Sequence, residues 1–480
     1  MKITKYKLGE LVEVTRGASL SGQFYAEEGK LIRLTLGNFN MNGGGFKENT
    51  SKTDLYFTGT VRDEFILNEG DIITPLTEQS LGLLGTTARI PESGKYIQSQ
   101  DVALVRCKKG LLDPNFCYYL ISSSIVRQQL SAAAQQTKIR HTSPEKIKDC
   151  TVWVPDFDVQ KNIGRILTDI DNKIAINRRI NDNLEAMAKQ LYDYWFVQFD
   201  FPNEDGKPYK SSGGAMVWND KMKREIPQGW GTQNLADCLK LKTERVNSKD
   251  IKDTDNYTPI EVIPRKQMSL HETVALENAM SGICRYSRRN ILLSNRRVYF
   301  HKVCIAPFDG LTRDTVLVLE PYNSGNLGYL YETVFADEFI LFATKHSYGS
   351  EQPVLSWTSA QKFNVLRPSN TIDKKYSEIV DSIIDSVLNN QIEIIKLTKQ
   401  RDELLPLLMN GQATVNYHLS AKVYPLPTAY KKAMPIVANQ IKVPWKTCVV
   451  PRISYDSSYY YCLDCNYFLS NYLTIAAFSR

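Results

Sequence analysis

The chain has 480 residues, which exceeds the size of an ordinary single domain, so we expect two to four folded units. Hydrophobic residues make up 42% of the chain and charged residues 23%, values that are typical of globular proteins and exclude a wholly disordered chain. The formal net charge of +7 is compatible with a polyanionic partner, but it is far below the excess of a histone-like protein.

The first predicted domain covers residues 1–155 and mixes strand and helix signals. Apolar runs at 71–75 and 102–105 are predicted as strands, and the first of them closes with a proline. Residues 142–145 carry the Ser/Thr-x-x-Glu/Gln spacing of a helix start, in which the two side chains satisfy the first free amides of the helix. A short run that ends at Pro155 completes the domain.

A long helix is predicted next, at residues 156–200. Apolar side chains recur there at alternating steps of four and three residues, which is the heptad pattern of a helix that pairs with another helix. This seam comprises Ile163, Leu167, Ile170, Ile174, Asn177, Asn181, Leu184, Ala188 and Leu191. The helix ends with Tyr192, Trp195 and Phe196, which offer more aromatic surface than one narrow seam uses. They are candidates for anchoring a partner protein, or they pack beneath the following segment.

Residues 201–229 are rich in Gly, Pro, Ser and Lys and are predicted to be a linker to a second domain at 230–368. That domain repeats the signals of the first in the same order. They are an opening at 8–11 and 235–238, a strand that ends in proline at 71–75 and 303–307, a second strand at 102–105 and 315–318, a helix start at 142–145 and 358–361, and a proline-terminated run at 152–155 and 365–368. Five matches in one order indicate an internal repeat.

A second long helix is predicted at residues 369–410, where the seam of the first recurs, at the same steps, from Tyr376 to Leu404. Asn177 and Asn390 occupy the midpoints of the two seams. Antiparallel pairing brings them together, and amides that bond each other fix the register, whereas the alternative is that both face water. The sequence thus predicts an α+β protein with two similar mixed α/β domains, each followed by a long helix, and the two helices pairing as an antiparallel coiled coil.

This order of domains and helices resembles the specificity subunits of type I restriction-modification systems. The resemblance extends over about residues 6–417 and is carried by four stretches of the helices, at 160–167, 177–187, 194–197 and 404–412. The rest of the predicted C-terminal extension, residues 411–480, departs from the family pattern, and we assign it no function.

The resemblance implies a subunit that recognises DNA and does no chemistry of its own. Each domain is then a target-recognition domain that reads one half of a bipartite, asymmetric site in double-stranded DNA. The helices set the spacing and dock two methyltransferase subunits, which bring S-adenosylmethionine, and motor-nuclease subunits join them with ATP and Mg. No cofactor is expected on this chain itself.

Candidate DNA contacts are basic residues that lie among amide and aromatic side chains, because Arg and Lys bind base edges and phosphates. In the second domain they are Arg285, Arg288, Arg289, Arg296 and Arg297. In the first domain the comparable residues are Arg16, Lys138 and Arg140. The alternative for each is a solvated turn or the outer face of a strand.

The sequence offers no catalytic motif that we can identify. It has neither a glycine-rich cofactor loop with the Asn/Asp-Pro-Pro-aromatic motif of an adenine methyltransferase nor a Walker A loop, so we expect a non-catalytic chain. The alternative is a site-specific, metal-dependent DNA endonuclease acting alone, since Asp156, Asp205 and Lys207 loosely fit a PD…(D/E)xK site. A helix cap at Asp156 and a turn at 203–206 explain the same residues. A coiled-coil scaffold without DNA binding leaves the doubled domain unexplained.

The compartment is predicted from the cysteines and the absence of targeting signals. The nine cysteines include a single CxxC pair, Cys462 and Cys465, with no second pair at zinc spacing, so two free thiols are expected rather than a metal site. Lys-Ile-Thr-Lys follows Met1 where a signal peptide has an apolar core. The most apolar stretch, at 459–478, is too polar for a membrane span. We expect a protein of the reducing cytoplasm.

Overall fold

The computed structural model divides into two compact units. It describes residues 2–416 except 41–43, 79–81, 134–139, 248–250, 253–255 and 276–281, together with short strands at 453–454, 461–462 and 474–477. The first unit contains residues 1–172, 397–422 and 467–480, and the second contains residues 173–396 and 423–466. The predictions for Lys138 and for the CxxC motif at 462–465 fall outside the described residues and side chains.

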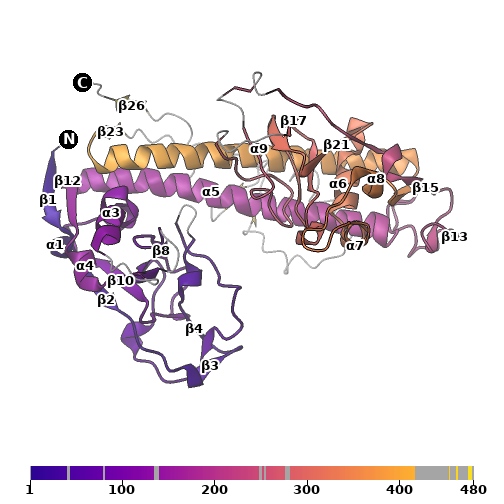
Figure 1. Ribbon diagram of the computed structural model, residues 1–480. Coiled ribbons are helices and arrows are strands. Elements are labelled where there is room, and N and C mark those ends of the chain that lie inside the picture. Colours follow the sequence, from indigo (N-terminus) through magenta and orange to yellow (C-terminus); the bar gives the residue numbers. More distant parts are fainter. Residues whose placement is uncertain are drawn as a thin grey trace. The chain divides into compact units, whose positions relative to one another are not determined.

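The first unit is a mixed α/β domain of short strands and helices (Figure 1). Its elements are β1 (Ile3–Lys7), α1 (Leu8–Leu11), β2 (Val12–Arg16), β3 (Tyr25–Ala26), β4 (Leu31–Arg33), β5 (Tyr56–Phe57), β6 (Ile72–Pro75), β7 (Thr77–Glu78), β8 (Ala88–Arg89), β9 (Tyr96–Ile97), β10 (Val102–Cys107), α2 (Pro114–Ser122), α3 (Ser124–Ala133), β11 (Arg140–His141), α4 (Pro144–Lys148), β12 (Thr151–Pro155), β23 (Ala413–Asn416) and β26 (Thr474–Ala477). The central sheet has the order β2-β10-β6-β8 and is antiparallel throughout. β10 pairs on both sides, which explains why its first four residues are apolar and buried. β1 pairs with β12 and so joins the two ends of the domain.

The second unit has the same kind of architecture. Its elements are β13 (Met216–Asn219), β14 (Arg224–Pro227), β15 (Gly231–Asn234), β16 (Leu239–Leu241), β17 (Ile283–Tyr286), β18 (Ile291–Ser294), β19 (Val303–Ile305), β20 (Gly310–Arg313), β21 (Val316–Pro321), α6 (Leu327–Phe335), α7 (Asp337–Lys345), α8 (Trp357–Ala360), β22 (Asn364–Arg367), β24 (Ile453–Ser454) and β25 (Tyr461–Cys462). The central sheet has the order β16-β21-β18-β19, and β15 pairs with β22 as β1 does with β12. Both central sheets therefore place their strands in the chain order first, last, second, third.

This shared topology confirms the internal repeat. In the second half of each copy, corresponding elements are separated by the same number of residues along the chain. The first elements of that half, α2 and α6, begin at residues 114 and 327. The strands β12 and β22 begin at residues 151 and 364, so their separation along the chain is the same. One predicted pairing of strands is wrong, because the run at 303–307 contains β19, the counterpart of β8. The counterpart of β6 is β18, whose apolar run carries no proline.

The two predicted helix starts are displaced by one or two residues. The hydroxyl of Ser143 accepts a hydrogen bond from the amide of Lys146 at 3.3 Å, and that of Ser356 accepts one from Ser359 at 3.1 Å. The caps are thus Ser143 and Ser356, rather than the threonines at 142 and 358. The corrected caps have the same separation along the chain as α2 and α6, which the predicted caps do not.

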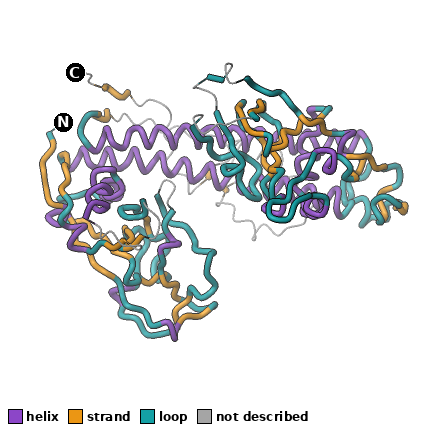
Figure 2. Tube along the Cα trace, in the orientation of Figure 1, coloured by secondary structure: helices purple, strands orange, loops and turns teal. Residues whose placement is uncertain are grey.

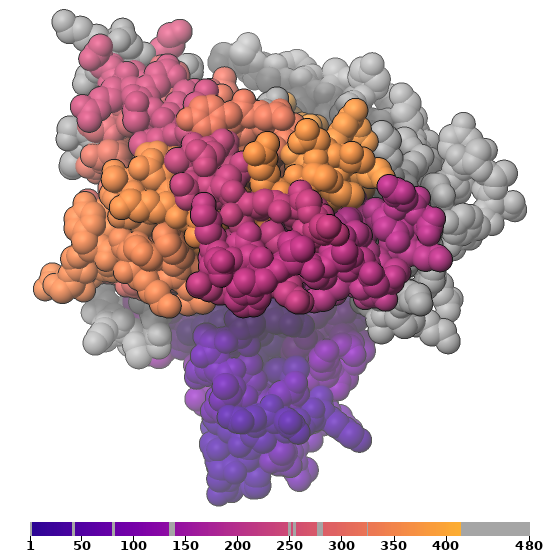
Figure 3. All heavy atoms as spheres, turned by 90° about the vertical axis from the view of Figure 1, so that its right-hand side faces the viewer, coloured from indigo at the N-terminus to yellow at the C-terminus, as the bar shows by residue number. Residues whose placement is uncertain are grey.

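Residues 201–229 do more than link the domains. They contain the hairpin of β13 and β14, and Phe201 stacks on both Tyr209 and Trp230, with ring centroids 4.6 and 4.9 Å apart. This segment forms a continuous part of the surface in Figure 3. The Gly, Pro and Ser content reflects tight turns rather than a free linker.

The two long helices are α5 (Phe157–Tyr192), which a single π turn at Asp193–Val197 continues, and α9 (Asn370–Met409). All nine predicted seam residues of α5 are buried. Contacts in each unit show antiparallel pairing (Figure 2): Asp171 meets Arg401 in the first unit, and Asn177 meets Glu393 in the second. The predicted fold class is confirmed.

Polar side chains interrupt the seam within the second unit, but they pair differently from the prediction. The Asn390 amide donates to the Oδ1 of Asn181 at 2.9 Å, and Asn181 donates to the carbonyl of Val387. Asn177 donates to Glu393 at 2.8 Å. The expected pairing of Asn177 with Asn390 is therefore wrong by one helical turn. Heptad spacing determines which positions face the partner helix, but the axial offset also depends on packing elsewhere.

We expect Asn390→Leu to lower the free energy of unfolding by about 1–2 kcal/mol, because Asn181 keeps a buried amide oxygen without its donor. Replacing Asn181 and Asn390 together by Leu removes both partners and should be nearly neutral. Denaturant unfolding of the single and double variants checks this. A single variant as stable as the wild type contradicts a role for this pair in fixing the register.

A buried carboxyl group makes the second unit sensitive to pH. Glu332 on α6 is 3% exposed, and burial raises its pKa to about 8, with Lys189 opposing the shift. The folded state binds this proton more tightly than the unfolded chain, so the contribution of Glu332 to stability is fully present below about pH 4.5 and is lost as the pH rises through about 8. Glu332→Gln should flatten this dependence and raise stability at pH 9 by on the order of 2 kcal/mol. Thermal unfolding from about pH 6 to 9 measures it, and a variant with the wild-type pH profile contradicts the assignment.

Candidate nucleic-acid interface

The candidate arginines of the second unit separate into two groups. Arg288 and Arg289 lie in the turn between β17 and β18, and both bind α9. Arg289 contacts Asp385 at 2.5 Å and Asp381 at 3.0 Å. Arg288 donates to the side chain of Asn389 at 3.0 Å and to the carbonyl of Pro307. These guanidinium groups are bound within the fold, which does not support their predicted DNA contact.

Three other candidates lie on strands. Arg285 on β17 is 3.7 Å from Glu244 and is only partly exposed. Arg140 on β11 pairs at 3.2 Å with Glu78, whose side chain is 2% exposed and which also accepts backbone amides of residues 82–84. Arg140 thus neutralises a buried carboxylate, a structural role that the sequence does not reveal. Arg16 is exposed at the end of β2 and stays a candidate contact.

Arg296 and Arg297 belong to a turn whose backbone is unusual. Arg297 and His301 have left-handed φ values of 48° and 55°, and Lys266, with φ 52°, donates its amide to the carbonyl of His301. Non-glycine residues rarely adopt this conformation, and clusters of such residues occur mainly where function requires them. The amide of Arg297 donates a hydrogen bond to the carbonyl of Pro353, and this bond attaches a third loop to the turn.

The three loops present an exposed surface that combines positive charge with aromatic rings. We define the basic–aromatic surface as Arg265, Lys266, Arg296, Arg297, Tyr299, Phe300 and Tyr348. Tyr299 is 48% and Tyr348 is 62% exposed. The guanidinium of Arg265 lies 4.2 Å from the ring centroid of Phe300. Sequence reasoning found Arg296 and Arg297 but missed Arg265, Lys266 and Tyr348, because loops distant in sequence bring them together.

Two neighbouring basic residues are excluded from this surface by their contacts. Lys302 donates to the carbonyls of Ile260 and Glu261, and burial lowers its pKa. His301 is 6% exposed and its Nε2 lies 2.7 Å from the carbonyl of Phe335. Burial lowers the pKa of His301, which favours the neutral ring. Both residues hold the loops in place.

The aromatic residues predicted to anchor a partner are instead part of the core. Trp195 and Phe196 are each 1% exposed, and the Phe196 ring lies 4.6 Å from that of Tyr329 and 4.8 Å from that of Tyr376. Tyr192 is half-buried, and its hydroxyl lies 3.3 Å from that of Thr333. The prediction is corrected, since α6 and α9 of the same unit already cover these rings.

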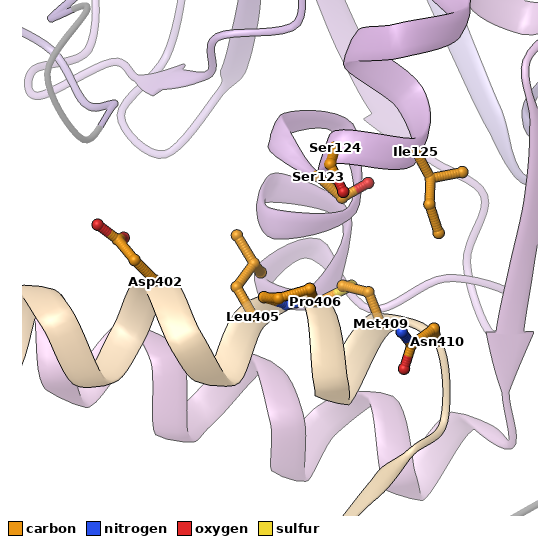
Figure 4. Close-up of a pocket in the computed structure, with 8 residues that line it drawn as sticks. All are labelled: Ser123, Ser124, Ile125, Asp402, Leu405, Pro406, Met409 and Asn410. Carbon is orange, nitrogen blue, oxygen red and sulfur yellow. The ribbon is translucent and has the colours of Figure 1, made fainter.

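An open groove of about 280 Å³ lies within the first unit (Figure 4). Its walls are the junction of α2 and α3 and the last turns of α9, which contribute Ser123, Ser124, Ile125, Asp402, Leu405, Pro406, Met409 and Asn410. Asp402 accepts hydrogen bonds from Arg401, so the groove offers no free acid–base pair. The chemistry of these residues does not suggest catalysis.

Two further observations bear on the alternatives. Among the described residues, no three His, Cys, Asp or Glu side chains come together as a metal site, and Asp156 and Asp205 belong to different units. Within the same residues, no helix combines the length and the apolar character needed to cross a bilayer.

Known proteins resemble both the sequence and the fold. Residues 2–186 match the family described as "Type I restriction modification DNA specificity domain". The MjaIX specificity subunit of Methanocaldococcus jannaschii is 23% identical over 331 residues, which are 64% of this chain and 71% of that protein. The HindI specificity subunit of Haemophilus influenzae is 22% identical, over 66% of this chain and 81% of that protein. The chain is thus similar, over about two thirds of its length, to type I restriction-modification specificity subunits.

A solved structure shares the fold of this chain. The S subunit from M. genitalium aligns with a TM-score of 0.52 at 16% identity, over 85% of this chain and 96% of that one. The family model ends at residue 186, within α5, so it covers the first domain and not its repeat. The second domain resembles the first in fold and in the strand order of its central sheet. The alignment with the HindI subunit, over 377 residues, is also longer than the region that the family model matches.

Proposed function

We propose that this specificity subunit recognises a DNA sequence for a type I restriction-modification complex, with each of its two domains contacting one half of a bipartite site. The observation that carries the proposal is the repeated domain, which supplies two similar recognition units in one chain. The paired helices α5 and α9 supply a connection of defined register. A site read by two different domains is asymmetric, because the loops of the two domains differ.

The basic–aromatic surface is our candidate for DNA contact in the second domain. Arginine and lysine bind phosphates and guanine edges, and exposed tyrosines add stacking and hydrogen bonds. The strained turn at 297–301 supports the choice, since its conformation is maintained by bonds to two other loops.

The remaining roles are proposals by analogy with the family. We propose that the chain is non-catalytic, that the helices dock two methyltransferase subunits, which bring S-adenosylmethionine, and that motor-nuclease subunits bring ATP and Mg. A cytoplasmic location is consistent with the six free cysteines of the described residues.

Selection of duplexes from a randomised library by the purified full chain tests the proposal. We expect two conserved sequence blocks at a fixed separation, and methylated adenines within the same sequence when the subunit is purified with its methyltransferase. Cleavage of duplex DNA by the chain alone with Mg would instead support the endonuclease.

Arg297→Ala should weaken recognition of one block by about tenfold or more, because a side chain that contacts a base or phosphate is lost while the fold is retained. Arg367, which is exposed on β22 rather than in this turn, provides the matched control. Binding of each variant to the selected duplex and to duplexes altered in one block measures the effect. Wild-type binding by Arg297→Ala would remove this residue from the interface.

A further inference from the structure

We propose that Arg288 and Arg289 clamp the second recognition domain to α9 and thereby set the separation at which the subunit reads its two half-sites. The inference rests on the proposed function and assigns a positioning role to residues that do not themselves contact DNA. All the contacts that carry it lie within the second unit.

The acceptors of the clamp form a ladder along one face of α9. Asp381, Asp385 and Asn389 follow at intervals of four residues, so they face the same side on three successive turns. Arg289 bridges the first two, and Arg288 reaches the third. A planar guanidinium that binds two acceptors fixes direction as well as distance. The turn is therefore held against rotation about the helix and against sliding along it.

The turn is built to present both side chains. Arg289 adopts a left-handed φ of 70°, and the amide of Arg288 donates to Asp309 at 2.7 Å. The amide of Ser287 donates to Asn290 at 2.8 Å, which closes the turn. Such a conformation is costly for a residue with a side chain and is retained where the surroundings favour it.

Helix α6 of the same domain also contacts Asp381, the first acceptor of the ladder. Asp381 also accepts the amide of Gly328 on α6 at 3.3 Å. A Cβ at Gly328 would lie 2.6 Å from Val380, so α6 and α9 approach closely only because this residue is glycine. Burial raises the pKa of Asp381 to about 6, and the positive charge of Arg289 opposes this rise.

The ladder is specific to the second half of the chain. The equivalent positions on α5, counted from the first residue of each helix, are Thr168, Asn172 and Ile176, which carry no charge. The first domain binds its long helix through a different contact, in which the Tyr119 hydroxyl of α2 donates to Asp171 of α5 at 2.6 Å. The clamp is thus present in the second domain and not in the first.

The orientation of a domain on its helix determines where its DNA-contacting loops lie. A domain that turns about α9 presents the same side chains in a different place, so it reads the same half-site at another separation. Loss of the clamp should therefore change the distance between the blocks and leave their sequences unchanged.

The test compares selected spacings among charge variants of the full chain, using a duplex library randomised along its length. We expect Arg288→Glu with Arg289→Glu to select the wild-type blocks at several adjacent separations, with affinity for the original separation about tenfold lower. Asp381→Arg with Asp385→Arg should behave alike, and combining all four substitutions should restore the single separation. Arg289→Lys keeps the charge but loses the bidentate contact with Asp381 and Asp385. This variant should also select a wider range of separations, but a narrower one than the double glutamate variant. Arg367→Glu serves as the control for an added negative charge.

The outcomes separate the possible errors. Variants that keep the wild-type separation and affinity overturn the clamp. Loss of one block's sequence without rescue by the four-fold exchange also overturns it, because the arginines then contact DNA. A wild-type chain that selects one uninterrupted block contradicts the proposed function instead.

Discussion

Phe196→Ala is expected to lower the free energy of unfolding of the protein by about 3–5 kcal/mol, because it empties the centre of a buried aromatic cluster. The Phe196 ring packs against the rings of Tyr192, Tyr329, Tyr376 and Trp230, the most distant of which has its centroid 5.8 Å away. Its loss removes apolar burial and leaves a cavity that neighbouring large rings cannot easily fill. Equilibrium unfolding in denaturant measures the change.

Trp218→Ala provides the matched control for Phe196. Trp218 is a larger aromatic on the β13 hairpin, but it is 62% exposed, and its loss should cost less than about 0.5 kcal/mol. If Phe196→Ala retained wild-type stability but no longer co-purified with the proposed methyltransferase subunits, the interpretation of this residue as a partner anchor would be restored.

Arg401→Met should destabilise the first unit by about 3 kcal/mol, since it leaves a half-buried carboxylate without its cation. Arg401 is 8% exposed and donates to Asp171 at 2.8 Å, and the other oxygen of Asp171 accepts the hydroxyl of Tyr119. The variant therefore weakens both the pairing of the helices and the attachment of α2. Burial, followed by the charge of Asp171, raises the pKa of Tyr119, so the hydroxyl stays a donor.

Replacing both partners distinguishes a lost contact from an unpaired charge. Asp171→Asn with Arg401→Met should recover most of the stability, because neither charge is then left buried. Lys399→Met removes an exposed cation 3.9 Å from Glu403 and should change the unfolding free energy by less than about 0.5 kcal/mol. Equal losses in the single and double variants would show that the methylene packing of Arg401, and not its charge, stabilises this region.

The features that sequence periodicity predicts are those that depend on one segment at a time. The seam of α5 is correct at every position, because the heptad spacing alone decides which side of a helix is apolar. The repeat is also recoverable, since its signals are local and ordered. The helix caps are displaced because several hydroxyl residues stand together at 142–143 and at 356–359, and only the backbone conformation decides among them.

The contacts that the sequence does not reveal depend on residues far apart in the chain. A run such as 285–289 looks like a DNA-binding segment, but its acceptors, Asp381 and Asp385, lie almost a hundred positions later. The aromatic end of α5 likewise looks available until α6 and the start of α9 are placed over it. The basic–aromatic surface was only partly found, because Arg265 and Tyr348 come from two other loops.

The constant separation between α2–α5 and their counterparts α6–α9 restricts where insertions are tolerated. A single residue inserted within α5 would turn the rest of its seam by roughly 100° and point that part away from the partner helix. The two copies do differ in length before α2 and α6. There β6 and β18 begin at residues 72 and 291, and β8 and β19 at residues 88 and 303, so both pairs lie further apart than the helices do. The two copies thus differ in length in the portion that carries two of the three loops of the basic–aromatic surface, so a change of loop length there leaves the helical connection undisturbed.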